Sequence, residues 1–158
     1  MKWPLVLLLI VAAPPGSAAD APAVPYPHGY RSWQHVKSML IEPGHPLAGL
    51  VEGLHHIYAN PKAMTGYRGG HYADGAVIVL DLLQPVQADQ ALGEGARKAV
   101  IVMHKDHRRY ALTGGWGFEV FAADSRAERK VGGQAAQQCF GCHLARQAHE
   151  YVFSEYRP

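Results

Sequence analysis

Cys139-Phe140-Gly141-Cys142-His143 is the stretch that decides how this 158-residue chain is interpreted. It holds the only two cysteines of the sequence, three positions apart, with a histidine directly after the second. Residues at i and i+3 lie on one face of a helical turn, so both sulfurs can reach the two vinyl groups of one porphyrin. This pattern indicates one covalently attached haem c, held by Cys139 and Cys142, with His143 as the proximal iron ligand.

Three other interpretations of the cysteine pair compete with haem attachment. A redox pair of the thioredoxin type follows the first strand of a βαβ unit, whereas this pair lies near the C-terminus. A structural zinc site needs four ligands. The chain has no further cysteine, but its ten histidines keep zinc open on ligand count alone. A strained short disulfide is the third alternative.

The N-terminus has the features of a secretory signal peptide over residues 1–19. Met1-Lys2 is positively charged, Leu5–Ala13 is apolar, and Ser17-Ala18-Ala19 offers small residues for cleavage before Asp20. The apolar run is well below the roughly 20 residues that span a bilayer, so no membrane span is expected after cleavage. We therefore expect a periplasmic protein, because bacteria attach haem through thioethers outside the cytoplasm.

Composition narrows the remaining chain to one domain. Residues 20–158 are long enough to bury a single core, and we expect one haem-binding cytochrome domain there. The net charge is +2, and the lysines and arginines are scattered along the chain. This pattern is not that of a nucleic-acid-binding protein or of a basic membrane-binding face.

Hydrophobic spacing predicts the secondary structure of this domain. A short amphipathic helix is predicted within Gly29–Ile41, and a second short helix from the Asn60-Pro61 start signal through Thr65. Polar loops are predicted at Tyr67–Gly75 and Gln84–Gly95, and a helical segment carrying the cysteines at Gln134–His149. Strands are predicted at Leu54–Tyr58, Ala76–Leu83, Ala99–Met103 and Trp116–Phe121, and Tyr151–Ser154 is an apolar tail that should dock.

The late position of the haem motif helps to select the fold class. Small electron-transfer cytochromes attach haem near the N-terminus, and helical cytochromes c′ need four long amphipathic helices. This chain has a late attachment site and a strand-rich middle. We therefore predict an α+β protein, predominantly an antiparallel sheet with a few short helices and a haem-bearing helix near the C-terminus.

Several short motifs occur together in an order that resembles a known family. They are Tyr30-Arg31-Ser32-Trp33, Ile57-Tyr58-Ala59-Asn60-Pro61, Asp74-Gly75, Lys105-Asp106, Gly114-Gly115-Trp116-Gly117-Phe118, the cysteine motif and Val152-Phe153-Ser154. The sequence resembles the cytochrome P-460 and cytochrome c′-β family over nearly the whole mature chain. The resemblance implies a periplasmic, mostly β protein, often a homodimer, whose haem iron has a proximal histidine and an open distal side.

The same resemblance locates the distal residues that divide the family. Cytochrome P-460 carries a lysine cross-linked to the porphyrin and a distal carboxylate, and it oxidises hydroxylamine. Counting from Asp74-Gly75 places the lysine position at Leu80, and counting from Lys105-Asp106 places the carboxylate position at Ile101. Asp81 should face the other way by strand alternation. An apolar distal pocket of Leu80, Ile101 and Leu47 is therefore expected.

These expectations lead to three functional hypotheses. The first is binding of small gases such as NO and CO at an apolar distal site, since neutral diatomics lose little on leaving water. The second is oxidation of hydroxylamine or NO in the P-460 manner, which requires a general base that Leu80 and Ile101 do not supply. The third is an electron-transfer cytochrome with a periplasmic partner. Its sixth ligand would come from Met39, Met64, Met103, His55, His56 or His71. No residue is assigned a catalytic role.

Overall fold

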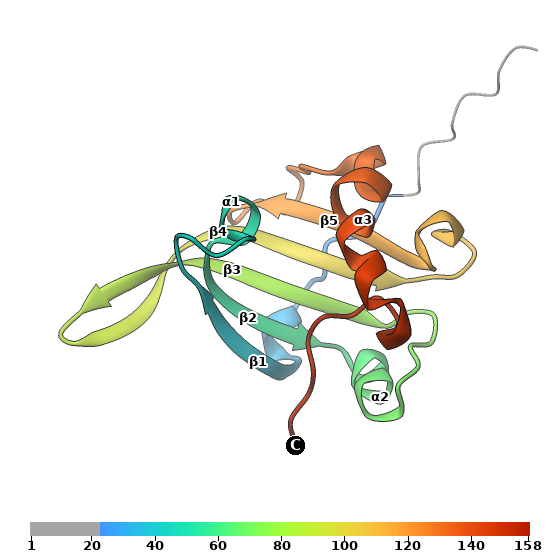
Figure 1. Cartoon of the computed structure of the whole chain (residues 1–158), viewed down its shortest axis with the longest axis horizontal. Helices are drawn as coiled ribbons and strands as arrows, with labels where there is room; N and C mark the ends of the chain where they lie inside the picture. The colour runs from blue at the N-terminus through green and yellow to red at the C-terminus, as the bar shows by residue number, and fades with distance from the viewer. Residues whose placement is uncertain (1–22) are drawn as a thin grey trace, which may run out of the picture.

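A five-stranded antiparallel sheet forms the centre of the protein in this computed structural model, which describes residues 23–158 (Figure 1). The strands are β1 (Gln34–Ile41), β2 (Gly53–Ala59), β3 (Val77–Ala88), β4 (Ala91–Lys105) and β5 (Trp116–Ala122). Their order in the sheet is their order in the chain. The predicted signal peptide, residues 1–19, lies outside the described residues.

The helices are short and are joined to the ends of the strands. They are α1 (Ala48–Val51), α2 (Pro61–Gly69), α3 (Gly141–His143), the 3-10 turns η1 (Tyr30–Ser32), η2 (Ala111–Thr113), η3 (Gly132–Gln134) and η5 (Leu144–His149), and the π-helical turn η4 (Ala136–Phe140). The predicted α+β class, with a helical segment near the C-terminus, is confirmed. Among residues 23–158, no helix has the length and apolar character needed to cross a membrane.

The predicted helix over Gly29–Ile41 is wrong. Only the single 3-10 turn η1 forms there, and the chain continues as the edge strand β1. The pairing of β1 with β2 shifts its register between His35 and Lys37, which is the mark of a bulge. Such a shift breaks the alternation of buried and exposed residues. The apolar residues here are therefore three or four positions apart, which is the spacing of a helix.

The predicted loop Gln84–Gly95 is also wrong. These residues extend β3 and β4 into a hairpin that projects beyond the rest of the sheet (Figure 1). Its turn is Asp89-Gln90, where φ is 49° and 59°, the left-handed values of a two-residue hairpin turn. Because most side chains of this arm are exposed on both faces, its sequence lacks the apolar alternation that marks a strand.

The two faces of the sheet are covered by opposite ends of the chain. We call the face that carries Ile78, Leu80 and Phe118 the first face. The C-terminal helical segment crosses it, and Ile78 and Phe118 share a core with Val152 (Figure 1). The second face is covered by N-terminal residues, and its core contains Val24, Tyr30, Tyr58, Val79, Val100, Val102, Tyr110 and Phe121.

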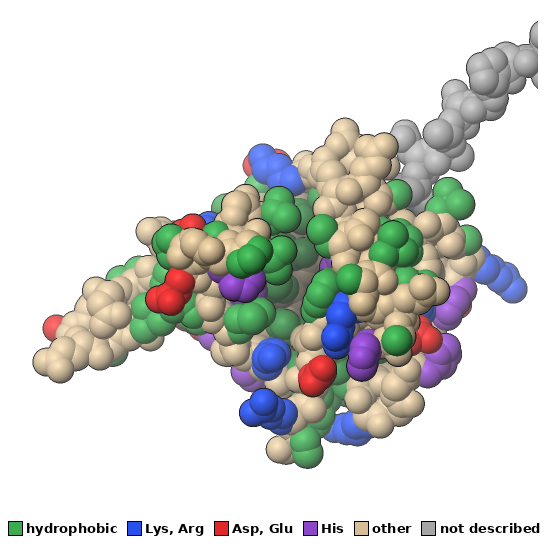
Figure 2. All heavy atoms as spheres, in the orientation of Figure 1, with side chains coloured by type: hydrophobic (Ala, Val, Ile, Leu, Met, Phe, Trp, Pro, Cys, Tyr) green, Lys and Arg blue, Asp and Glu red, His purple; other side chains and the backbone are tan. Residues whose placement is uncertain are grey.

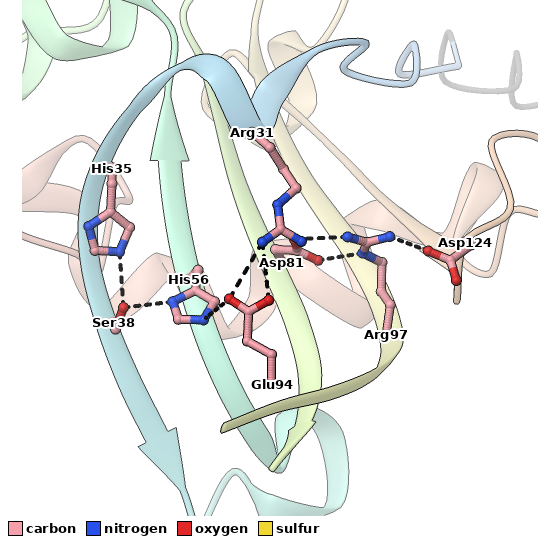
Figure 3. A network of polar contacts seen from close by, with 8 residues as sticks. All are labelled: Arg31, His35, Ser38, His56, Asp81, Glu94, Arg97 and Asp124. Carbon is pink, nitrogen blue, oxygen red and sulfur yellow. Dashed lines mark hydrogen bonds and ion pairs between the residues drawn. The ribbon is translucent and has the colours of Figure 1, made fainter. Parts of the chain in front are cut away.

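The second face also holds a chain of charged and polar contacts (Figure 3). Asp81 is fully buried, and its carboxylate lies 2.6 Å from Arg97 Nε and 3.5 Å from Arg31. Arg31 also contacts Glu94 on the hairpin arm at 3.1 Å, and Glu94 lies 3.0 Å from His56. Since a buried carboxylate is costly unless it is paired, these partners keep Asp81 on the second face, as strand alternation predicts.

Asn60 joins helix α2 to the sheet. Its side-chain oxygen accepts hydrogen bonds from the backbone N–H groups of Ala63 at 2.9 Å and Val77 at 3.0 Å. Its amide donates to the carbonyl of Gly75 at 2.9 Å. The predicted helix start is therefore confirmed. The helix runs past Thr65 to Gly69, so the first part of the predicted Tyr67–Gly75 loop is helical.

Replacement of Asn60 by alanine removes all three of these hydrogen bonds. We expect Asn60→Ala to lower the free energy of unfolding by about 2–3 kcal/mol, because it loses a helix cap and leaves two backbone N–H groups without their acceptor. Urea denaturation measures this loss. Thr65→Ala, in the same helix, is the control and should change stability by less than about 0.5 kcal/mol. Equal effects of the two substitutions would contradict the role given to Asn60.

Candidate functional site

The cysteine motif lies in the C-terminal helical segment, as the sequence predicts. Cys139 belongs to the π-helical turn η4, and Cys142 and His143 to the short helix α3. Single π-helical turns are rare in proteins, and those that do occur are often found at functional sites. Cys139 and Phe140 pack against the core of the first face, so the motif is held against the sheet.

Both cysteines are free thiols in the structure. Cys139 is half-buried, and burial raises the pKa of its thiol to about 11, whereas Cys142 is exposed. Within residues 23–158, no group of three or more His, Cys, Asp and Glu side chains is placed to hold a metal ion. The two thiols are therefore bound neither to each other nor into a ligand cluster of the described residues.

His143 has one ring nitrogen committed to the backbone. Its Nδ1 lies 2.6 Å from the carbonyl oxygen of Tyr151, and because a carbonyl only accepts, Nδ1 must carry the proton and donate. Burial lowers the pKa of His143, so the ring is neutral near pH 7 and Nε2 keeps its lone pair. A histidine whose second nitrogen donates to a carbonyl is the usual form of a metal-ligating imidazole.

Aromatic rings enclose the His143 imidazole. Phe118 of β5 lies 4.9 Å from it between ring centroids, and Phe153 of the tail lies 5.0 Å away. The ring centroids of Phe140 and Phe118 are 6.3 Å apart. Three of the four phenylalanines are thus gathered near His143, and the fourth, Phe121, packs on the second face.

The C-terminal tail docks, as predicted, and completes the environment of His143. Val152 is buried in the core of the first face. Ser154 Oγ lies 2.6 Å from the hydroxyl of Tyr67 in α2, and Arg146 donates to the carbonyl of Val152 at 3.3 Å. The tail therefore contacts both α2 and the helical segment that carries the cysteine motif.

Leu80, Ile101 and Val120 form a row across the centre of the first face. Leu80 pairs with Ile101 and Ile101 pairs with Val120, so the three side chains lie side by side on the same face. All three are only half-buried, although Ile78 and Phe118 in the adjacent row are buried. Figure 2 shows a hollow between the α1 side and the C-terminal segment, with hydrophobic side chains along it.

The structure thus brings together two of the three predicted distal residues. Leu47 precedes α1 and its side chain is 40 % exposed, so its place in the pocket stays a prediction. Sequence reasoning missed Val120, although alternation along the predicted strand Trp116–Phe121 puts it on the same face as Phe118. Between Val77 and Leu82 of β3 and along β5, the first-face residues are all apolar: Ile78, Leu80, Leu82, Trp116, Phe118, Val120 and Ala122.

Comparison with known proteins supports the same cofactor. The family model described as Cytochrome P460 matches residues 27–154. The chain belongs to the cytochrome P460 family. None of the curated proteins compared with this sequence matches it. Membership implies a c-type haem, and the residues present fit this group: two free thiols on one helical turn, a neutral imidazole with Nε2 available, and an apolar hollow on the sheet.

The candidate sixth ligands of this cytochrome P460 family member are dispersed. Met64 and Met103 are buried in the core of the first face, and Met39 is exposed on the edge strand. His71 is exposed and contacts Glu150, and His56 lies in the second-face network. Most of these side chains are therefore packed in the core, exposed at the edge of the sheet or engaged in polar contacts.

His55 differs from the other candidates, because it lies on the first face without belonging to the apolar core that contains Met64 and Met103. It pairs with Leu82, and its Nε2 donates to the carbonyl of Val51 in α1 at 2.5 Å. The side chain is almost completely buried, and burial lowers its pKa. Its Nδ1 has no hydrogen-bond partner among the described residues, so it keeps a free lone pair.

The two cysteines should differ in reactivity in the haem-free protein. Because the thiolate is the reactive form and the pKa of Cys139 is raised to about 11, alkylation of Cys139 should be slow at pH 8. Its rate should rise about tenfold per pH unit up to that pKa. Exposed Cys142 should react first, as peptide mass spectrometry would show. In haem-loaded protein neither should be labelled; rapid labelling of both would contradict haem attachment at this pair.

Proposed function

We propose that this protein is a periplasmic mono-haem cytochrome that binds small gas ligands, nitric oxide above all, at an apolar distal site. Cys139 and Cys142 hold one haem c through two thioethers, and His143 is its proximal ligand. The observation that carries the proposal is the row of Leu80, Ile101 and Val120, half-buried and apolar at the centre of the first face. The haem, when bound, supplies an iron coordination position for a diatomic molecule.

The cysteine content supports one haem. Each c-type attachment uses two thiols and a following histidine, and the chain has a single such set. The helical turn places Cys139 and Cys142 three residues apart on one face, and both are free thiols. The features of a signal peptide in residues 1–19 support export to the periplasm, where attachment takes place.

The apolar row supports binding of a neutral gas. An anion or a cation that entered between Leu80, Ile101 and Val120 would lose its hydration without gaining a charged partner, whereas NO and CO lose little. The nearby acids on β3 and β5 already have partners. Asp81 pairs with Arg97, and Glu119 pairs with Arg129 at 3.0 Å.

Oxidation of hydroxylamine or NO is the second candidate, and His55 is the observation that favours it. This reaction needs a group that accepts protons from the bound nitrogen compound. His55 lies on the first face with an unprotonated Nδ1 that has no partner among the described residues. The family resemblance places Leu80 and Ile101 at the positions where the P-460 members have their lysine and carboxylate, and for this reason gas binding is proposed first.

Contact between two copies of the chain is proposed from the family resemblance. The projecting hairpin of β3 and β4 exposes Val86 on one of its faces and Leu92 on the other, and a second subunit that packed on either face would cover an apolar side chain. An electron-transfer partner in the periplasm is also proposed.

Absorption spectra of the purified holoprotein separate the candidate functions. We expect a five-coordinate high-spin haem in the oxidised and reduced states, with new bands when NO is added and, in the reduced state, when CO is added. A red-shifted reduced band from a modified porphyrin would instead support P-460 chemistry. A low-spin spectrum that is unchanged by CO would support an electron carrier with a sixth protein ligand.

Replacement of Leu80 tests its place beside the ligand. Leu80→Lys puts an ammonium group in the apolar row, so it should perturb the haem spectrum and slow NO binding by roughly tenfold or more. Stopped-flow mixing measures the association rate. Leu112→Lys, the same substitution at an almost fully exposed leucine in η2, is the matched control and should bind NO like the parent. An unchanged rate in Leu80→Lys would show that Leu80 does not line the site.

A further inference from the structure

Lys105 is buried at the end of β4 with a set of partners that the proposed function does not use. Only 1 % of its side chain is exposed. Its Nζ donates to the carboxylate of Glu150 at 3.0 Å and to the carbonyl of Gly114 at 3.1 Å. It also lies 4.9 Å from the centre of the Trp116 ring. A buried ammonium group is unfavourable unless it is fully partnered, so the burial of Lys105 depends on these three contacts.

Glu150 is held through both its side chain and its backbone. Burial would raise the pKa of Glu150, but hydrogen bonds with Lys105 and His71 outweigh burial and lower it. The indole nitrogen of Trp116 donates to the carbonyl of Glu150 at 2.9 Å. We call Lys105, Trp116 and Glu150 the Lys105 anchor.

The anchor holds a backbone turn that is unfavourable without support. Glu150 and Tyr151 have φ values of 54° and 66°, and two consecutive residues other than glycine rarely adopt the left-handed conformation. The Tyr151 N–H donates to the carbonyl of Arg146 at 2.8 Å, so the chain reverses directly after the helical segment. This reversal brings the Tyr151 carbonyl within 2.6 Å of His143 Nδ1.

We propose that Lys105, Trp116 and Glu150 are positioning residues for His143, because they hold the Glu150–Tyr151 turn whose carbonyl accepts the Nδ1 proton. This inference rests on the proposed ligation of haem iron by His143, but it is independent of which gas binds. A hydrogen bond at Nδ1 makes the opposite nitrogen a stronger electron donor. A stronger donor stabilises the higher charge of ferric iron, so the anchor keeps the reduction potential low and the iron–histidine bond strong.

The main variant of the test removes the ion pair without leaving an unpaired buried charge, and a second variant removes the carboxylate while Lys105 keeps its charge. The double variant Lys105→Met/Glu150→Gln replaces both charges, and Glu150→Ala removes the carboxylate alone. Glu128→Ala is the matched control, because Glu128 also pairs with a lysine, Lys130, but both of these side chains are exposed. Each holoprotein is examined by resonance Raman spectroscopy of the ferrous haem and by redox titration.

We expect the iron–histidine stretching frequency to fall in the double variant and in Glu150→Ala. The equilibrium constant for reduction of the ferric haem should rise by about tenfold or more, in line with typical effects of groups that contact a metal ligand. Glu128→Ala should match the parent in both measurements. Should Glu150→Ala fail to fold, the double variant still gives both measurements.

Three outcomes would overturn the inference. An unchanged frequency and potential in the folded double variant would show that the pair only stabilises the fold. Equal changes in Glu128→Ala would show a general effect of lost charge. Absence of an iron–histidine band in the parent would overturn the ligation by His143 and this inference together, whereas a parent that shows the band but does not bind NO would overturn only the gas-binding proposal.

Discussion

The hydrogen bond from His143 Nδ1 to the carbonyl of Tyr151 is the contact on which the candidate site depends. It joins the helical segment that carries the cysteines to the C-terminal tail, and it decides which nitrogen of the imidazole keeps a lone pair. The tail in turn is held by the burial of Val152 and by the contact between Ser154 and Tyr67. Without the left-handed turn at Glu150 and Tyr151, this carbonyl would not face the ring.

The two faces of the sheet differ in the side chains at their centres. The centre of the first face is apolar, with Leu80, Ile101 and Val120 in one row. The second face holds the buried carboxylate of Asp81, which is paired with Arg97 and Arg31 (Figure 3). Because successive residues of a strand point to opposite faces, a buried carboxylate can lie next to Leu80 in sequence and still face away from it.

Much of the fold could be predicted from local pattern, and the failures have physical causes. The strands at Ala76–Leu83 and Ala99–Met103 were predictable because they are buried and β-branched. The edge strand β1 was not, because its bulge shifts the alternation of buried positions. The hairpin arm was missed because most of its residues are exposed on both faces, so nothing in its sequence distinguishes it from a loop.

The motif of the site was readable in the chain, since the spacing of Cys139, Cys142 and His143 is local and a helical turn brings the two thiols onto one face. The pairing of Leu80 with Ile101 follows from two strands whose partners could be assigned only after folding. The meeting of Lys105 with Glu150, 45 positions later, had no sequence signal at all. Periodicity reports which face of an element is buried, but which distant side chains meet there depends on how the elements pack together.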